Sequence, residues 1–127
     1  MTKLDRLITA IAYYEGWKPA GAGDTEKGSL SWNFHNPGAL RKSPFEVANK
    51  QGFSVFNTDQ EGMFALKWDI QQKAKGNTST GLNADSTLRE LIFVYAPPSD
   101  GNDSEKYLKE VLTMTGFSEN MKLGDLV

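Results

Sequence analysis

The spacing of apolar residues predicts four helices, separated by segments rich in glycine, proline and polar residues. The first is expected over residues 3 to 15, where apolar side chains recur three and four positions apart. Thr2 and Asp5 resemble a capping box at its start, and Gly16 is typical of the position just after a helix end. The apolar stripe of this helix consists of Leu4, Leu7, Ile8, Ile11 and Ala12.

Three further helical patterns follow along the chain. A long helix is expected after the capping box of Thr58 and Glu61, and it ends at Gly76. A shorter helix is expected to be capped by Ser86 and to end before Pro97-Pro98, because proline cannot continue a helix. The stripes of the three helices are Met63, Leu66, Ile70 and Ala74; then Leu88, Leu91, Ile92 and Tyr95; then Tyr107, Leu108, Val111 and Leu112, stopped by Gly116.

The remaining segments predict turns and one short strand. Asn36-Pro37-Gly38 predicts a type II turn, in which proline presets φ and glycine takes a positive φ. The alternation over 53–56 predicts a strand, expected to pair with residues 39–41. Residues 18–29 contain too much glycine for a helix or strand, and residues 121–126 are expected to pack back on the core. The sequence therefore predicts one domain, residues 1–127, that is mainly α with a small β-hairpin.

Composition excludes several classes of function. With 127 residues, 39% of them hydrophobic, the chain can bury one core. Its 14 basic and 16 acidic residues give a net charge of −2, which argues against a nucleic-acid binder. The chain has no cysteine and one histidine, His35, so we expect no disulfide, no metal and no cofactor. No apolar run is long enough for membrane insertion, and Asp5 stands where a signal peptide would be positively charged.

Glu15 is the most informative residue for chemistry. The stripe of the first helix continues to position 15, so this carboxylate is expected on the buried face. It also lies in the last turn, where the helix dipole disfavours an anion. Burial and dipole both raise the pKa of a carboxyl group, and a neutral Glu can act as the general acid in glycoside cleavage. The alternative is a Glu whose side chain extends past the helix end into solvent.

Several strings of the sequence, taken in order, carry a resemblance to a known family. They are Ile11-Ala12-Tyr13-Tyr14-Glu15-Gly16-Trp17, Asn36-Pro37-Gly38-Ala39-Leu40-Arg41, Phe53-Ser54-Val55-Phe56, Gly62, Tyr95-Ala96-Pro97-Pro98-Ser99-Asp100-Gly101-Asn102-Asp103 and Tyr107. Together they span nearly the whole chain and resemble a phage-type lysozyme-like domain. The resemblance is to the superfamily of lytic transglycosylases and goose-type lysozymes, which cleaves peptidoglycan.

The resemblance implies a lysozyme-like fold with Glu15 as the catalytic acid. It places residues 36–41 on the turn that opens the hairpin, and Tyr95 with the following loop on the opposite side of the cleft. The sequence departs from the family pattern at two places. Gly16 stands where lytic transglycosylases usually have serine after the acid. Ala96-Pro97-Pro98 replaces their Asn-Ala-Gly, so hydrogen bonds from an asparagine there are not assumed.

The second catalytic group stays open at the level of sequence. An inverting hydrolase needs a base across from the acid, and the candidates are Asp24, Glu26 and Glu61, with Asp59 and His35 weaker. A single-Glu route instead uses the N-acetyl group of the substrate and ends in either hydrolysis or a 1,6-anhydro product. Most aromatic residues are expected in the core, including Phe34, Phe64, Phe93 and Trp68. The expected substrate-binding residues are Trp17, Asn36, Arg41, Tyr95 and Asn102.

These observations favour a muramidase that cuts the MurNAc–GlcNAc β-1,4 bond of peptidoglycan glycan strands, acting as a monomer. A lytic transglycosylase is the nearest alternative. A non-catalytic glycan-binding or virion-structural module of the same fold is another, and a helical protein-binding module that uses the Tyr95–Pro98 loop is a third. Without a signal peptide, the protein is expected to be phage-encoded and released to the cell wall, or to be a domain of a larger cell-wall or virion protein.

Overall fold

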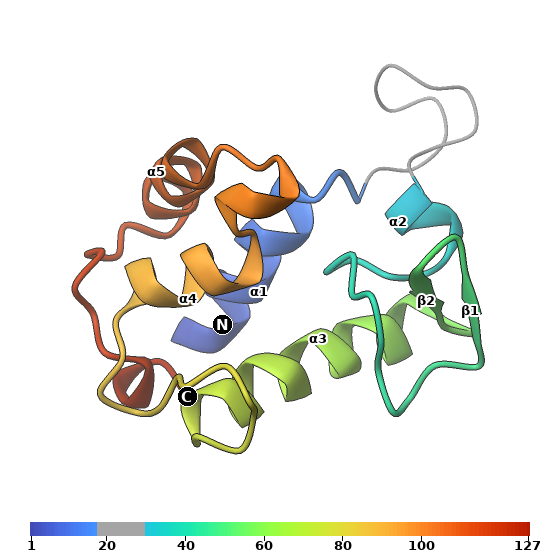
Figure 1. Cartoon of the computed structure of the whole chain (residues 1–127), viewed down its shortest axis with the longest axis horizontal. Helices are drawn as coiled ribbons and strands as arrows, with labels where there is room; N and C mark the ends of the chain where they lie inside the picture. The colour runs from blue at the N-terminus through green and yellow to red at the C-terminus, as the bar shows by residue number, and fades with distance from the viewer. Residues whose placement is uncertain (18–29) are drawn as a thin grey trace. The chain divides into compact units, whose positions relative to one another are not determined.

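The computed structural model describes residues 1–17 and 30–127, and its described residues are mainly α-helical with one small hairpin (Figure 1). This confirms the fold class expected from the sequence at the level of mainly α with a small β-hairpin. In chain order the elements are α1 (Lys3–Tyr14), α2 (Leu30–Asn33), β1 (Ala48–Lys50), β2 (Phe53–Val55), α3 (Asp59–Ala74), α4 (Leu88–Tyr95), η1 (Pro98–Asp100), α5 (Ser104–Thr115) and η2 (Leu123–Asp125).

The described residues divide into two compact units. The terminal unit comprises Met1–Ala10 and Ile70–Val127, and the central unit lies within Ile11–Asp69. Helices α1 and α3 each contribute residues to both units. No helix among the described residues is long and apolar enough to cross a membrane.

Helix α1 begins as the sequence predicts. The backbone N–H of Thr2 donates to Oδ2 of Asp5 at 3.2 Å, and the N–H of Asp5 donates to Oγ1 of Thr2 at 3.0 Å. These reciprocal bonds satisfy two donors that a helix start leaves without partners. The predicted stripe is buried along its length: Leu4, Leu7, Ile8, Ile11 and Ala12.

The strand predicted near residues 53–56 is present in the central unit as β2. It pairs antiparallel with β1, and Ala48 stands opposite Val55. Gln51 and Gly52 connect the strands with φ of 55° and 81°. A type I′ hairpin turn requires positive φ at both central residues, and its twist matches that of the strands.

The expected pairing of this strand with residues 39–41 is wrong. The ladder partner is β1, because the two-residue turn brings β1 and β2 together at once. The earlier segment contributes the carbonyl of Leu40, which accepts from the N–H of Ser54 at 2.9 Å. An alternating apolar pattern reveals a strand but does not identify its partner.

The turn at residues 36–38 is present, but it is not type II. The N–H of Ala39 donates to the carbonyl of Asn36 at 3.0 Å, as in a β-turn. Gly38 does not have the positive φ that a type II turn needs. The left-handed residues here are instead His35 and Ala39, with φ of 52° and 50°.

Helix α3 has the predicted start and end. The N–H of Glu61 donates to Oγ1 of Thr58 at 3.1 Å, and Oε2 of Glu61 accepts from the N–H of Asn57 at 3.2 Å. The side chain of Glu61 thus reaches one residue further back than in the expected capping box. The helix ends two residues before Gly76.

One face of α3 differs from the expectation that its aromatic residues are core. Leu66, Ile70 and Ala74 are buried, as the stripe predicts, but Phe64 is 55% exposed. Position 64 lies two residues before Leu66, so about 200° of helix rotation carries it to the other side. The other aromatic residues assigned to the core are half-buried: Phe34, Trp68 and Phe93.

In the terminal unit, Thr87 rather than Ser86 caps α4. Its side chain accepts from the N–H of Glu90 at 3.2 Å, and its own N–H donates to Oε1 of Glu90 at 3.2 Å. The glutamate three positions after Thr87 completes a capping box, and Ser86 has no such partner at the same spacing. Ser86 is buried and accepts from the N–H of Asn83 at 3.0 Å.

The C-terminal half of the chain packs as predicted. Helices α4 and α5 contact each other (Figure 1), and α5 stops at Gly116. Leu123 and Leu126 are buried, and Thr87 forms an isolated antiparallel bridge with Lys122. The terminal segment therefore packs on the core and helps to fix the start of α4.

Candidate functional site

Glu15 directly follows the last residue of α1. Its N–H donates to the carbonyl of Ile11 at 2.9 Å. The N–H of Gly16 then donates to the carbonyl of Tyr13, and the N–H of Trp17 to that of Ala12, both at 3.1 Å. These two bonds, with φ of 80° at Gly16, form a Schellman motif. The helix therefore ends at a defined residue, and Glu15 lies at the negative end of its dipole.

Glu15, expected on the buried face of the first helix, is half-buried. The helical repeat ends at Tyr14, and the chain leaves the helix axis at Gly16. The stripe of α1 therefore does not extend unchanged to position 15. A half-buried carboxyl group combines partial shielding from water with access from outside.

Helix α2, which the sequence analysis did not identify, lies next to this helix end. Oγ of Ser31 donates to the backbone carbonyl of Glu15 at 3.3 Å. The rings of Trp17 and Trp32 have centroids 5.2 Å apart and are tilted by 45°. At four residues α2 is too short for an apolar repeat, so the sequence carries no periodic signal for it.

The indole of Trp17 carries a buried donor. Its Nε1 has no acceptor among the described residues. A buried donor without a partner costs about 1–3 kcal/mol, and such groups occur at functional sites. This observation adds to the expectation that Trp17 contacts substrate.

Asn36 is buried and bound on all sides by backbone. Its Nδ2 donates to the carbonyls of Leu40 and Ser54 at 2.9 and 3.0 Å, and its Oδ1 accepts from the N–H of Leu40 at 2.9 Å. The side chain is 1% exposed. Asn36 therefore holds the turn to the hairpin, and we leave it out of the proposed substrate contacts.

Arg41 and Glu61 lie at the surface of the central unit. The guanidinium of Arg41 lies over the ring of Phe53, 5.1 Å from its centroid. The carboxylate of Glu61 is exposed and accepts a hydrogen bond from the N–H of Asn57, just before α3. The other two base candidates, Asp24 and Glu26, lie outside the described residues.

His35 and Asp59 form a pair that the sequence analysis did not combine. Nδ1 of His35 lies 2.8 Å from Oδ1 of Asp59, and the two side chains are 43% and 39% exposed. A carboxylate at Nδ1 orients the imidazole and leaves Nε2 outside the pair. The two residues are 24 positions apart, so spacing within one element could not reveal the contact.

Tyr95 and Asn102 belong to the terminal unit. Tyr95 is the last residue of α4, and Nζ of Lys73 lies 5.4 Å from its ring centroid. Nδ2 of Asn102 donates to the carbonyl of Pro97 at 3.2 Å across the turn η1. Both side chains thus border the loop that the resemblance assigns to substrate, and the bond of Asn102 shapes that loop.

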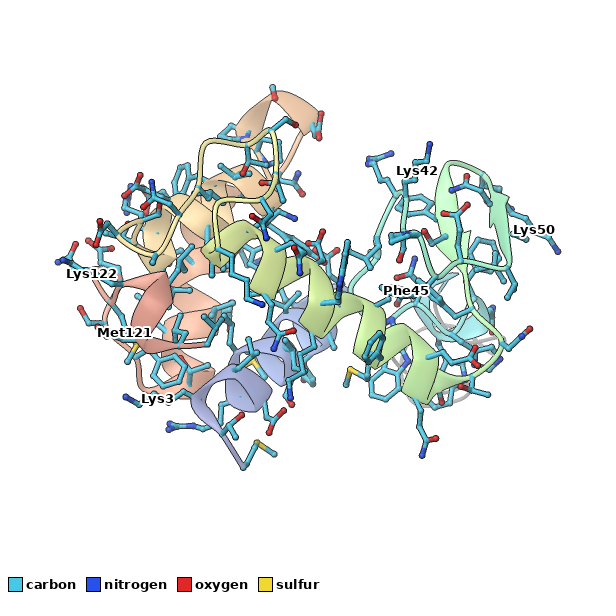
Figure 2. The ribbon with its side chains drawn as sticks, turned by 90° about the horizontal axis from the view of Figure 1, so that it is seen from below. Lys3, Lys42, Phe45, Lys50, Met121 and Lys122 are labelled. Carbon is cyan, nitrogen blue, oxygen red and sulfur yellow. The ribbon has the colours of Figure 1, made fainter. Side chains whose placement is uncertain are left out.

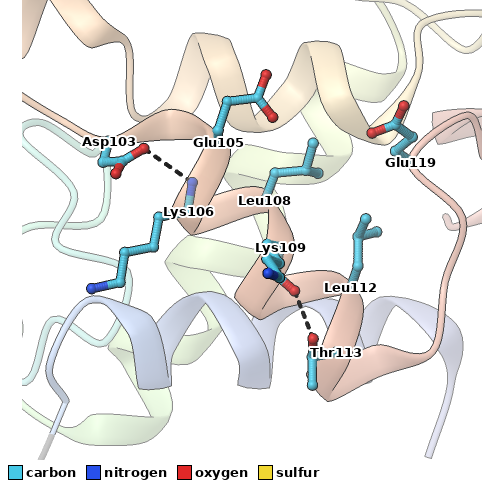
Figure 3. A pocket seen from close by; sticks show the side chains of 8 residues that line it. All are labelled: Asp103, Glu105, Lys106, Leu108, Lys109, Leu112, Thr113 and Glu119. Atoms are coloured by element: carbon cyan, nitrogen blue, oxygen red, sulfur yellow. Dashed lines mark hydrogen bonds between the residues drawn. The ribbon is translucent and has the colours of Figure 1, made fainter.

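A surface pocket of about 750 Å³ lies along α5 (Figure 3). Leu108 and Leu112 contribute apolar surface, and Glu105 and Glu119 contribute carboxylates. Arg89 forms ion pairs with both carboxylates, and these pairs raise the pKa of its guanidinium. Glu105 and Glu119 therefore share one cationic partner within the terminal unit.

Among the described residues, no group of three or more His, Asp and Glu side chains could hold a metal ion. Comparison with protein-family models, with curated proteins and with solved structures finds no match to this chain.

Proposed function

We propose that this protein is a peptidoglycan-cleaving glycosidase, a muramidase that cuts the MurNAc–GlcNAc β-1,4 bond with Glu15 as general acid. One observation carries the proposal: a half-buried glutamate follows the last residue of α1, two residues before Trp17, whose ring contacts that of Trp32. The dipole of α1 disfavours a negative charge there, which suits a group that must hold a proton before donating it.

In this mechanism Glu15 donates its proton to the glycosidic oxygen while the bond from that oxygen to C1 breaks. The sugar then carries positive charge of oxocarbenium character. Aromatic side chains such as Trp17 contact the apolar face of a sugar ring, and an indole N–H can donate to a sugar or acetamido oxygen. Gly16 supplies no hydroxyl to orient the carboxylate, and the defined helix end fixes the backbone that carries Glu15.

Two catalytic routes differ in whether a second carboxylate takes part in the reaction. Glu61 already binds the backbone at the start of α3, and Asp59 is paired with His35, which favours a route without a second carboxylate among the described residues. In that route the acetamido group of the substrate stabilises the charge at C1, and Glu15 afterwards accepts a proton. Attack by water makes the protein a hydrolase, whereas attack by the 6-hydroxyl of the sugar makes it a lytic transglycosylase. We propose that the reaction is a hydrolysis.

The substitution Glu15→Gln tests this proposal. It keeps the size of the side chain and removes the proton donor, so the rate of peptidoglycan cleavage should fall by about 10²–10⁴-fold. Glu110→Gln is the matched control, because it makes the same change at an exposed carboxylate of α5. Circular dichroism verifies that both variants fold.

The proposal is overturned if Glu15→Gln keeps more than about half of the wild-type rate. A folded wild-type protein that binds cell wall and releases no cut glycan would instead identify a non-catalytic binding module.

A further inference from the structure

Three aromatic rings form a cluster in the central unit, in the region where Figure 2 labels Phe45. The ring of Phe45 lies 5.1 Å from that of Phe64 and 5.2 Å from that of Trp68, at interplanar angles of 79° and 88°. Phe64 and Trp68 are four residues apart on α3 and so share one face of the helix. We call Phe45, Phe64 and Trp68 the aromatic platform.

The platform is exposed although its residues are large and apolar. Phe64 is 55% exposed, Phe45 is 39% exposed and Trp68 is half-buried. Edge-to-face packing leaves ring surface uncovered, and the proposed reaction does not use these rings. Exposed apolar surface that is gathered in one place marks a binding site more often than scattered residues do.

The loop that carries Phe45 is held in place by a hydrogen-bonded carboxylate. Oε1 of Glu46 accepts from Oγ of Ser54 at 2.8 Å, from the N–H of Ser43 at 3.1 Å and from Nδ2 of Asn49 at 3.3 Å. The bond from Ser54, followed by that from Ser43, lowers the pKa of Glu46. The N–H of Phe45 itself donates to Oγ of Ser43 at 3.2 Å. The exposed ring is therefore presented in a prepared position, which lowers the entropic cost of binding.

The size of the platform favours a sugar over a protein partner. A whole phenylalanine has about 200 Å² of surface, so the exposed parts of Phe45 and Phe64 amount to about 200 Å². A stable protein interface needs about 800 Å² on each partner. Two or three ring faces match the area of one or two hexose rings, whose C–H faces stack on aromatic side chains.

We propose that the aromatic platform is a saccharide-binding site, which stacks hexose rings of a glycan strand outside the catalytic position of Glu15. We take the glycan to be N-acetylated because this inference rests on the proposed function, in which the substrate is peptidoglycan. The three side chains of the platform are uncharged, which suits contact with the C–H faces of sugar rings. Figure 2 shows the side chains of Lys42 and Lys50 extending away from Phe45.

A titration of the full-length protein with the β-1,4-linked tetramer of N-acetylglucosamine tests the platform. The Glu15→Gln background prevents cleavage during the measurement, and calorimetry gives Kd. Phe64→Ala removes the most exposed ring of the platform and should weaken binding about three- to tenfold. Phe45→Ala should weaken it similarly. Tyr13→Ala is the matched control, because Tyr13 is 63% exposed and stands on α1.

Each result decides the proposal. Equal Kd values for Phe64→Ala and Tyr13→Ala, or no binding of the tetramer by the parent protein, would overturn it. Self-association that Phe64→Ala abolishes, without an effect on saccharide binding, would assign the platform to a second copy of the chain and overturn it as well. The role of Glu15 is judged separately by cleavage, so failure of the catalytic proposal leaves this titration decisive.

Discussion

Gly62 of α3 lies directly against the backbone of His35. A Cβ atom at position 62 would overlap the carbonyl oxygen of His35 and would lie 2.8 Å from Cδ of Pro37. Helix α3 and the segment that precedes the turn at residues 36–38 thus approach each other as closely as backbone permits. The absence of a side chain at Gly62 is what allows this approach.

Gly62→Ala is therefore expected to destabilise the protein by about 1–3 kcal/mol, because the added methyl group must displace backbone rather than a flexible side chain. This net loss already includes the gain of about 1 kcal/mol that alanine gives over glycine within a helix. Urea unfolding measures the difference. Gln60→Ala, at an exposed position of the same helix, should change the free energy of unfolding little; an equally stable Gly62→Ala variant would refute the close approach.

Asn36→Asp tests whether Asn36 holds the turn to the hairpin. The carboxylate keeps an acceptor for the N–H of Leu40 but cannot donate to the carbonyls of Leu40 and Ser54. The carbonyl of Ser54 loses this donor, whereas the carbonyl of Leu40 still accepts from the N–H of Ser54, so stability should fall by about 1–3 kcal/mol. Asn57→Asp, at an exposed site in the same unit, is the control. A variant of wild-type stability would mean that water or another group replaces the amide.

Glu46→Gln should change how stability depends on pH. The pKa of Glu46 is lowered by its hydrogen bonds, chiefly that from Ser54, so the folded state binds a proton less readily than the unfolded state. Its contribution is present above the unfolded-state value of about 4.5 and is lost as pH falls through the lower folded-state pKa. Glu46→Gln should have a lower Tm than wild type at pH 7, with a smaller gap at pH 3. A gap that does not depend on pH would contradict this account.

The end products of peptidoglycan digestion distinguish the two catalytic routes. We expect free reducing ends, because hydrolysis is the proposed outcome. Mass spectrometry of the released muropeptides decides, since a 1,6-anhydro end is lighter than a reducing end by one water. Anhydro-muropeptides as the main product would assign the protein to the lytic transglycosylases and leave Glu15 as the acid.

Local signals account for the parts of the structure that the sequence predicted well. The start of α1 depends on Thr2 and Asp5, three residues apart, and the end of α1 depends on Gly16. Such contacts form within one helical turn, so the order of residues is enough to reveal them. Glu15 was identified as a candidate acid for the same reason, since its place at the helix end is a local property.

The errors concern choices between neighbouring signals or between distant segments. Ser86 and Thr87 are both good cap residues, and the position of Glu90 decided for Thr87. Phe64 was assigned to the core from its residue type, although the stripe of its own helix places it outside. The spacing of Glu90 from Thr87 and of Phe64 from Leu66 distinguishes both cases.

The sequence by itself determined α1, α3, α4 and α5, the caps of α1 and α3, the stops at Gly16, Gly76 and Gly116, the strand after residue 52 and the choice of Glu15 as candidate acid, because each depends on residues a few positions apart. Only the tertiary structure decided that β2 pairs with β1, that Asn36 bridges to Ser54, that Gly62 meets His35 and that Phe45 packs on α3. These contacts join residues that are close in space and many positions apart in the chain. Their free energy comes from packing and from buried hydrogen bonds, which no local pattern of residues encodes.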